Sequence, residues 1–174
     1  MSNAGVYWGV NEEILQSPHL VVAVDPGKSG AVCRMGQGRF VVWRDFKTLE
    51  DIARAVYEAT PGVTHGVMEL VHAMPGQGVC SMFSFGRAAG VADGAFAVSR
   101  PNLKIEYVSP QKWQNYFRAL LGVDKDSQFD SRDIASKVCP WSTPYLKRVK
   151  DHNTADAVLM AAWKIFSLKN SARP

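Results

Sequence analysis

The spacing of hydrophobic and polar positions changes several times along the chain. Short β-branched runs between turn residues predict strands, whereas apolar residues three and four apart predict helices. The strands predicted in this way cover residues 19–24, 30–35, 39–44, 64–70 and 103–108. The predicted helices cover residues 48–59, 79–97, 110–121, 127–138 and 153–168, with a basic loop over 140–149.

The order of these elements predicts the fold class. Three strands come first, with Gly36-Gln37-Gly38 as the hairpin turn between the second and the third, and helices and strands then alternate. This order is typical of an α/β domain with a five-stranded mixed β-sheet flanked by α-helices. Residues 19–170 are expected to form this single domain. Residues 1–18 have little periodicity and are expected to be a weakly ordered N-terminal arm, or residues left by cloning.

Composition narrows the class of protein. The chain has 174 residues, of which 47% are hydrophobic and 21% charged, enough for a buried core without a metal or disulfide. There is no run of about 18 apolar residues and no signal-peptide pattern, so no membrane association is expected. The three cysteines are too widely spaced to predict a metal-binding pair or a disulfide framework, which fits a reducing cytoplasm.

The charge of the chain is unevenly distributed. Residues 1–99 carry seven Lys and Arg against nine Asp and Glu, a net −2, whereas residues 100–174 carry thirteen against seven, a net +6. A basic half beside an acidic half favours a polyanionic partner, although an ordinary basic surface would look the same.

Four acidic residues stand where predicted elements begin or end. Asp25 closes the first strand, Glu69 ends the fourth, Asp151 precedes the last helix and Asp156 lies in its first turns. Side chains at the carboxyl edge of such a sheet meet in the crevice where ligands bind. Converging carboxylates repel one another unless cations bind, and oxygen ligands suit Mg²⁺ or Mn²⁺. Two such ions can activate water and stabilise the leaving oxygen of a phosphodiester.

Each acid also has an ordinary structural explanation. Asp25 could start a turn, Asp151 could cap a helix and Asp156 could belong to a buried ion pair. Glu69 at the end of an apolar strand is harder to explain in this way. The joint pattern therefore favours a metal site over four unrelated acids.

Several short segments carry a specific combination of motifs. They are Val22-Ala23-Val24-Asp25-Pro26-Gly27, Met68-Glu69, Met74-Pro75-Gly76-Gln77-Gly78, Phe83-Ser84-Phe85-Gly86-Arg87, Val108-Ser109-Pro110-Gln111-Lys112-Trp113, Lys125-Asp126-Ser127 and Lys150-Asp151-His152-Asn153-Thr154-Ala155-Asp156-Ala157. Over about residues 20–168, this combination resembles RuvC-type Holliday junction resolvases of the ribonuclease H-like superfamily. The bacteriophage and plant-organelle branch is the most similar.

The resemblance implies a ribonuclease H-like fold and an activity. The expected enzyme is a homodimer that nicks four-way DNA junctions symmetrically, leaving 5′-phosphate and 3′-hydroxyl ends. It would use two Mg²⁺ ions per active site, with Mn²⁺ possible, and no organic cofactor. A phage-infected or bacterial cytoplasm is expected, or an organelle if a transit peptide was removed. The alternatives are another ribonuclease H-like nuclease, acting on RNA–DNA hybrids or flaps, and a non-catalytic junction-binding protein.

The resemblance also assigns site residues. Asp25, Glu69 and Asp156 match metal ligands of the family, and the Lys-Asp-His string favours Asp151 as the fourth ligand, with His152 and Asn153 in reserve. Lys125 is expected to act in catalysis by neutralising the scissile phosphate, as Lys150 could also do. Both lysines could equally be solvated surface charges.

DNA contacts are expected mainly from basic and polar side chains. The expected DNA-binding residues are Lys28, Gln77, Arg87, Lys112, Lys125, Arg132, Lys147, Arg148 and Lys150. Further basic candidates are Arg100, Lys104, Arg118 and Lys137. His72, Phe83 and Phe85 are candidates for a wedge at the open centre of the junction, although the apolar segment around the two phenylalanines favours core packing. The glycine-rich segment 79–97 is the expected dimer interface.

Overall fold

The computed structural model describes residues 12–27, 29–70 and 78–171. Its strands form one five-stranded mixed sheet in the order β3-β2-β1-β4-β5. They are β1 (Val21–Asp25), β2 (Ala31–Gly36), β3 (Arg39–Arg44), β4 (His65–Glu69) and β5 (Ile105–Val108). The first three strands form an antiparallel meander, while β4 is parallel to both β1 and β5. The fold class predicted from the sequence is confirmed.

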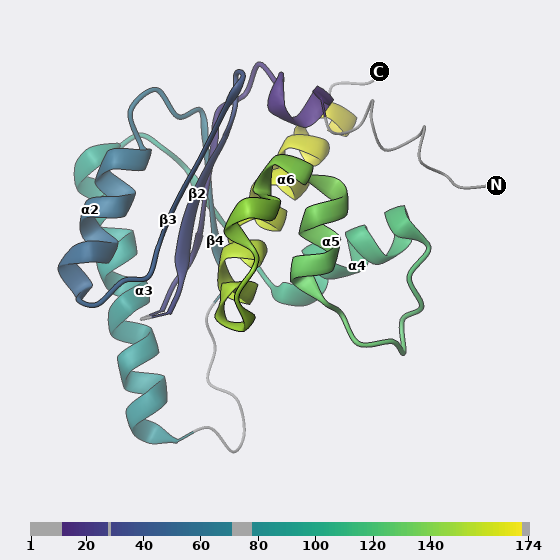
Figure 1. The fold of residues 1–174 in the computed structure, drawn as a ribbon. Coiled ribbons are helices and arrows are strands. Elements are labelled where there is room, and N and C mark those ends of the chain that lie inside the picture. Colours follow the sequence, from purple (N-terminus) through teal and green to yellow (C-terminus); the bar gives the residue numbers. More distant parts are fainter. Residues whose placement is uncertain (1–11, 28, 71–77, 172–174) are drawn as a thin grey trace.

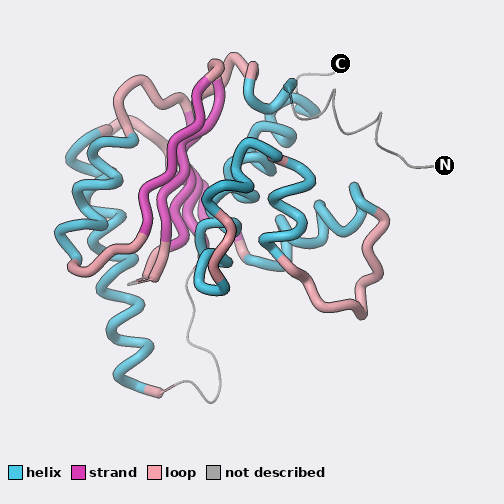
Figure 2. Tube along the Cα trace, in the orientation of Figure 1, coloured by secondary structure: helices cyan, strands magenta, loops and turns pink. Residues whose placement is uncertain are grey.

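Helices cover both faces of the sheet and give a three-layered molecule (Figures 1 and 2). One face is covered by α2 (Leu49–Ala59) and α3 (Val79–Ser99). The other is covered by α4 (Pro110–Leu121), α5 (Ser131–Val138) and α6 (His152–Ser171). No helix of the described part of the chain is long and apolar enough to span a membrane.

The central strand β1 contributes to two separate cores. Val21 and Ala23 pack in the core beneath α6, whereas Val22 and Val24 pack in the core beneath α2 and α3. Successive side chains of a strand point to opposite faces, so a strand buried on both sides is apolar throughout. The alternation places Asp25, the last residue of β1, on the α6 face of the sheet.

Two segments differ from the sequence prediction. Helix α5 begins at Ser131 rather than at residue 127, because the Asp130 carboxylate accepts hydrogen bonds from the backbone of Arg132 and Asp133 and so caps the helix. The expected loop over 140–149 is instead largely two 3₁₀ helices, η1 (Pro140–Tyr145) and η2 (Val149–Asp151).

The expected N-terminal arm is partly integrated into the domain. Residues 12–15 are helical, and the Ile14 side chain is fully buried in the α6 core. Glu13 forms an ion pair with Lys169 near the end of α6. The prediction of a weakly ordered arm is therefore wrong for residues 12–18, and its remaining part lies outside the described residues.

Candidate active site

Three of the four predicted carboxylates line one cleft at the carboxyl edge of the sheet. Asp25 and Glu69 are the last residues of the parallel neighbours β1 and β4, where Val24 pairs with Met68. Asp156 reaches the same cleft from the second turn of α6. Since Val67 packs in the α6 core, strand alternation directs Glu69 towards α6 as well. The sheet and one helix thus bring together acids from distant parts of the sequence.

Burial and mutual repulsion disfavour the charged forms of these acids. Asp25 is only 6% exposed, and burial together with the charges of Glu69 and Asp156 raises its pKa well above the usual range. Burial and the charge of Asp156 raise the pKa of Glu69 to about 7. Burial raises the pKa of Asp156 to about 6, although a hydrogen bond from Ser131 and the charge of His152 oppose the rise.

The oxygen-rich donor set is chemically suited to a hard divalent cation. Asp156 Oδ1 is buried and has no hydrogen-bond partner among the described residues. An orphaned carboxylate oxygen beside two further acids with raised pKa values is the environment that Mg²⁺ or Mn²⁺ stabilises. As they stand, however, no three His, Cys, Asp or Glu side chains in the described residues are arranged to hold an ion. Metal binding would therefore require side-chain movement within the cleft.

The turn between β1 and β2 forms one wall of the cleft. Asn153, one helical turn before Asp156, donates hydrogen bonds from Nδ2 to the Ser29 carbonyl oxygen at 2.7 Å and to Ser29 Oγ at 2.9 Å. These bonds join the first turn of α6 to the β1–β2 turn that follows Asp25. At Gly30, an added Cβ would lie 2.1 Å from the Asp25 carbonyl oxygen, so the turn requires glycine.

Solved structures of junction resolvases share this architecture. Thermus thermophilus RuvC aligns with a TM-score of 0.56 and 14% identity, covering 89% of this chain and 99% of that chain. T. thermophilus RuvC in complex with a Holliday junction substrate gives a TM-score of 0.58, 13% identity and the same coverage of 89% and 99%. The chain has a RuvC-like fold.

A second resolvase supports this fold assignment. The yeast mitochondrial Holliday junction resolvase Ydc2 aligns with a TM-score of 0.51 and 10% identity, covering 98% of this chain and 92% of that chain. No protein-family model and no curated protein matches the chain. The likeness at this level of identity concerns the fold alone.

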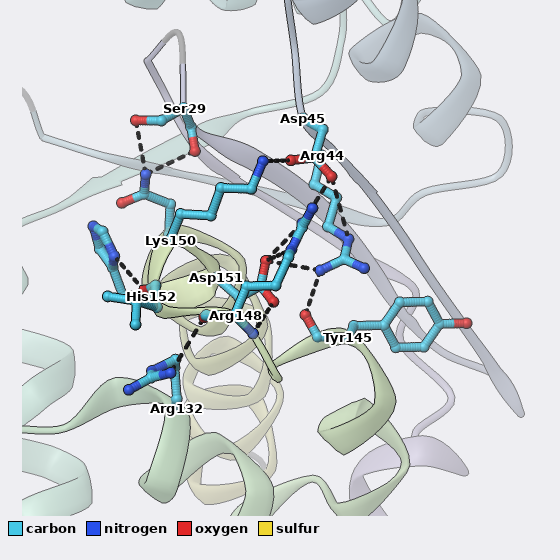
Figure 3. Close-up of polar contacts among 11 residues, drawn as sticks. Ser29, Arg44, Asp45, Arg132, Tyr145, Arg148, Lys150, Asp151 and His152 are labelled. Carbon is cyan, nitrogen blue, oxygen red and sulfur yellow. Dashed lines mark hydrogen bonds and ion pairs between the residues drawn. The ribbon is translucent and has the colours of Figure 1, made fainter.

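Within this RuvC-like fold, Asp151 does not join the other three acids. The described residues that line the cleft include Asn153 but not Asp151. Asp151 is 1% exposed and accepts hydrogen bonds from Arg44 Nη1 and Arg148 Nε, both at 2.9 Å (Figure 3). Four carboxylates were expected to converge, but only three line the cleft. The fourth, Asp151, is bound instead by Arg44 and Arg148. His152, also held in reserve, lies beside the Val149 carbonyl oxygen, 3.2 Å from Nδ1.

Several expected DNA-binding side chains are engaged in ion pairs. Arg148 and Lys150 bind Asp45, and Lys112 pairs with Glu106. Arg132 donates to the Arg148 carbonyl oxygen at 3.2 Å. Lys125 and Lys147 are exposed and are not among the described residues lining the cleft, and Arg87 stacks over the Phe83 ring. Lys28 and Gln77 lie outside the described residues.

The two candidate wedge phenylalanines have different environments. Phe83 is 70% exposed near the start of α3, so the expectation that it packs in the core is wrong. Phe85 is half-buried and lines the cleft, with its ring 3.5 Å from where a Cβ of Gly27 would stand. His72 lies outside the described residues.

Three residues in or beside the cleft were not predicted from the sequence: Ser29, Arg44 and Asp45. Ser29 lines the cleft four positions after Asp25, and its place in a Pro-Gly turn next to a candidate ligand is a signal that could have identified it. Arg44 and Asp45 contact residues more than 100 positions later. No local pattern in the sequence indicates these contacts.

Proposed function

We propose that this protein is a divalent-metal-dependent DNA endonuclease that resolves four-way junctions. The observation that carries the proposal is the meeting of Asp25, Glu69 and Asp156 at the carboxyl edge of a RuvC-like sheet, with Asp156 Oδ1 left without a hydrogen-bond partner in the described structure. Acids in this arrangement are destabilised when ionised, and bound cations would relieve that cost.

Each acid has a distinct part in this proposal. Asp25, the most deeply buried, would be a ligand of the bound cations, and Glu69 and Asp156 would complete the set of carboxylate ligands. Asn153 replaces Asp151 as the fourth candidate, and its Oδ1 would be the ligand atom because Nδ2 is engaged with Ser29. When bound, the ions would lower the pKa of the attacking water and stabilise the departing 3′ oxygen.

Cutting both strands of a junction requires two active sites, so we propose a homodimer. Gly86, Gly90 and Gly94 recur at every fourth position of α3, and a Cβ added at any of them would meet no described heavy atom within 4 Å. Such a stripe permits close approach of a second helix. Equilibrium sedimentation is expected to show a dimer at micromolar concentration, and Gly90→Leu should weaken it. A wild-type monomer would contradict paired nicking.

The decisive experiment is a cleavage assay with a matched pair of variants. Wild type is expected to nick a four-way junction symmetrically in Mg²⁺, leaving 5′-phosphate and 3′-hydroxyl ends, and not in chelator. Asp25→Asn should bind the junction but not cleave it. Asp133→Asn removes an exposed acid of α5 that pairs with Lys137, and should leave cleavage unchanged. Nicking by Asp25→Asn would overturn the assignment.

The alternative from another class is a non-catalytic junction-binding protein. Such a protein would not need the three acids with raised pKa values that line the cleft. The same assay separates the candidates if RNA–DNA hybrids and flaps are included as substrates. Binding without cleavage in Mg²⁺ or Mn²⁺ would favour the second candidate, and cleavage of hybrids or flaps alone would favour another ribonuclease H-like nuclease.

The finer classification also remains a prediction. The Lys150-Asp151-His152 string supports the bacteriophage and plant-organelle branch. The site of action would then be a phage-infected or bacterial cell, or an organelle if a transit peptide was removed.

A further inference from the structure

A cationic pocket lies directly beside the acidic cleft. It is lined by basic side chains from the end of β3 and from the segment before α6, including Arg44, Arg148 and Lys150. Ser29 lines both the pocket and the cleft. The acidic cleft and the cationic pocket are therefore neighbours that share Ser29, and a nucleic-acid strand held in the cleft would extend into the pocket.

Asp151 fixes the floor of this pocket. Its buried carboxylate accepts hydrogen bonds from Arg44 Nη1 at 2.9 Å, from Arg148 Nε at 2.9 Å and from the Arg148 backbone amide at 2.7 Å. Burial alone would raise the pKa of Asp151, but the hydrogen bonds from Arg148 and the charge of Arg44 outweigh it and lower the pKa. Arg44 also donates to the Tyr145 carbonyl oxygen at 2.6 Å. The two guanidinium groups are thus held in place before any ligand arrives.

Asp45 is the exposed anion at the mouth of the same pocket. Its Oδ2 accepts a 2.7 Å bond from Arg148 Nη2, and its Oδ1 accepts a 2.6 Å bond from Lys150 Nζ (Figure 3). The two carboxylate oxygens of Asp45 are thus bound by two different basic side chains. A phosphodiester group can be bound in the same way through its two non-bridging oxygens. The Asp45 side chain is 41% exposed, so solvent and ligands can reach it.

The backbone at Asp45 is also unusual. Its φ is +62°, in the left-handed region that few residues other than glycine adopt. Conformations of this kind persist where surrounding contacts enforce them, and they cluster at functional sites. Here the two ion pairs hold the carboxylate over the pocket.

We propose that Arg44, Arg148 and Lys150 form a binding site for a backbone phosphate of the DNA strand that enters the cleft, and that Asp45 occupies the place of this phosphate until DNA displaces it. This inference rests on the proposed function, because it assumes that DNA occupies the cleft. Asp151 is then a positioning residue that acts through the two arginines and not on the reacting atoms.

The first test removes the internal anion. Asp45→Asn keeps a residue type that tolerates positive φ and abolishes the charge. Junction affinity, measured by fluorescence anisotropy in chelator, should rise by about threefold to tenfold because the ion pairs of Asp45 with Arg148 and Lys150 no longer have to be broken. Glu13→Gln is the matched control. It changes the net charge equally and frees Lys169 near the C-terminal end of α6, whereas Asp156 of the cleft lies near the other end of that helix. It should change affinity by less than about twofold.

The second test removes one cation. The Lys150 side chain binds Asp45 and forms no ion pair with Asp151 in the described structure, so Lys150→Gln should leave the fold intact, as melting by circular dichroism will check. Its junction affinity should fall, and the slope of log affinity against log salt concentration should decrease by about 1. In the double variant, the gain from Asp45→Asn should shrink, because Asp45 acts partly through Lys150.

The outcomes separate this inference from the proposed function. If wild type nicks junctions while Asp45→Asn binds no more tightly than Glu13→Gln, the phosphate site is overturned and the proposed function stands. An unchanged salt slope in Lys150→Gln also overturns the site. If Asp45→Asn strengthens binding to duplex and junction DNA alike and no junction is cleaved, the phosphate site is supported and the resolvase proposal fails.

Discussion

The guanidinium of Arg44 on β3 donates a 2.9 Å hydrogen bond to the carboxylate of Asp151, a residue 107 positions later in the chain. Asp151 is almost completely buried, and Arg148 is its other cationic partner. The ion pair thus joins the sheet to the segment that starts α6, the helix that carries Asn153 and Asp156.

Replacing Arg44 with methionine should therefore destabilise the fold. The variant keeps an apolar stem but leaves Asp151 with Arg148 alone, and we expect a loss of about 1–3 kcal/mol in the free energy of unfolding. Urea denaturation measures it. Lys47→Met, at an exposed position nearby, should lose less than about 0.5 kcal/mol. Equal losses in the two variants would show that the Arg44–Asp151 bond adds nothing to stability.

The raised pKa values in the cleft predict the pH dependence of stability without metal. An acid whose pKa is higher in the folded than in the unfolded state stabilises the fold below its unfolded pKa, and this contribution is lost as pH rises through the folded pKa. The folded values are about 6 for Asp156 and about 7 for Glu69, against ordinary values of 3.8 and 4.5. In chelator, the melting temperature should therefore fall between about pH 4 and pH 7.

Two controls test the cause of this fall. Asp156→Asn removes one of the titrating acids and should flatten the profile. Excess Mg²⁺ at pH 8 should raise the melting temperature of the wild type more than that of the variant, because the cation binds the ionised acids. A wild-type melting temperature that rises from pH 5 to pH 7 in chelator would contradict the shared cleft.

The tight turn after β1 predicts different outcomes for two neighbouring glycines. Gly30→Ala would place a Cβ 2.1 Å from the Asp25 carbonyl oxygen, which forces the backbone to move and should cost about 3 kcal/mol. Gly27→Ala would bring a Cβ only to 3.5 Å from the Phe85 ring, an ordinary contact, and should be nearly neutral. Chemical denaturation of both variants checks the pair. If Gly30→Ala were as stable as Gly27→Ala, the turn would not be under this steric constraint.

The exposed ring of Phe83 predicts a variant that affects DNA binding and not folding. Phe83→Ala should change unfolding free energy by less than about 0.5 kcal/mol, since the side chain is largely in solvent. If the ring stacks on an unpaired base, the free energy of junction binding should become less favourable by about 1–3 kcal/mol. Val98→Ala, at an exposed apolar position near the other end of α3, is the control. Equal junction affinities for both variants would exclude Phe83 as a wedge.

Local patterns in the sequence were sufficient to predict the sheet and the three acids that line the cleft. Each strand is short, apolar and followed by turn residues, so Asp25 and Glu69 could be assigned to strand ends. Asp156 stood out because its neighbours in the helix are apolar. These signals depend on residues only a few positions apart.

The remaining features depend on contacts between distant segments. Asp151 was predicted as a ligand from its place before the last helix and from the Lys-Asp-His string. The arginine that pairs with it lies 107 positions earlier in the chain, so no local pattern indicates this pair. Ile14 lies in a segment too short to show a period, and its burial depends on packing against the α6 core. Phe83 belongs to an apolar segment, but near the start of α3 its side chain is left in solvent.

The alternation of side chains along β1 also limits which length changes the chain can tolerate. Removing or adding one residue between Val21 and Asp25 would turn the carboxylate from the α6 face to the face covered by α2 and α3, and would exchange the residues of the two cores. Insertions are therefore expected in connections between elements, such as residues 122–130 between α4 and α5. The number of residues in the central strand β1 thus determines that the Asp25 carboxylate reaches the cleft.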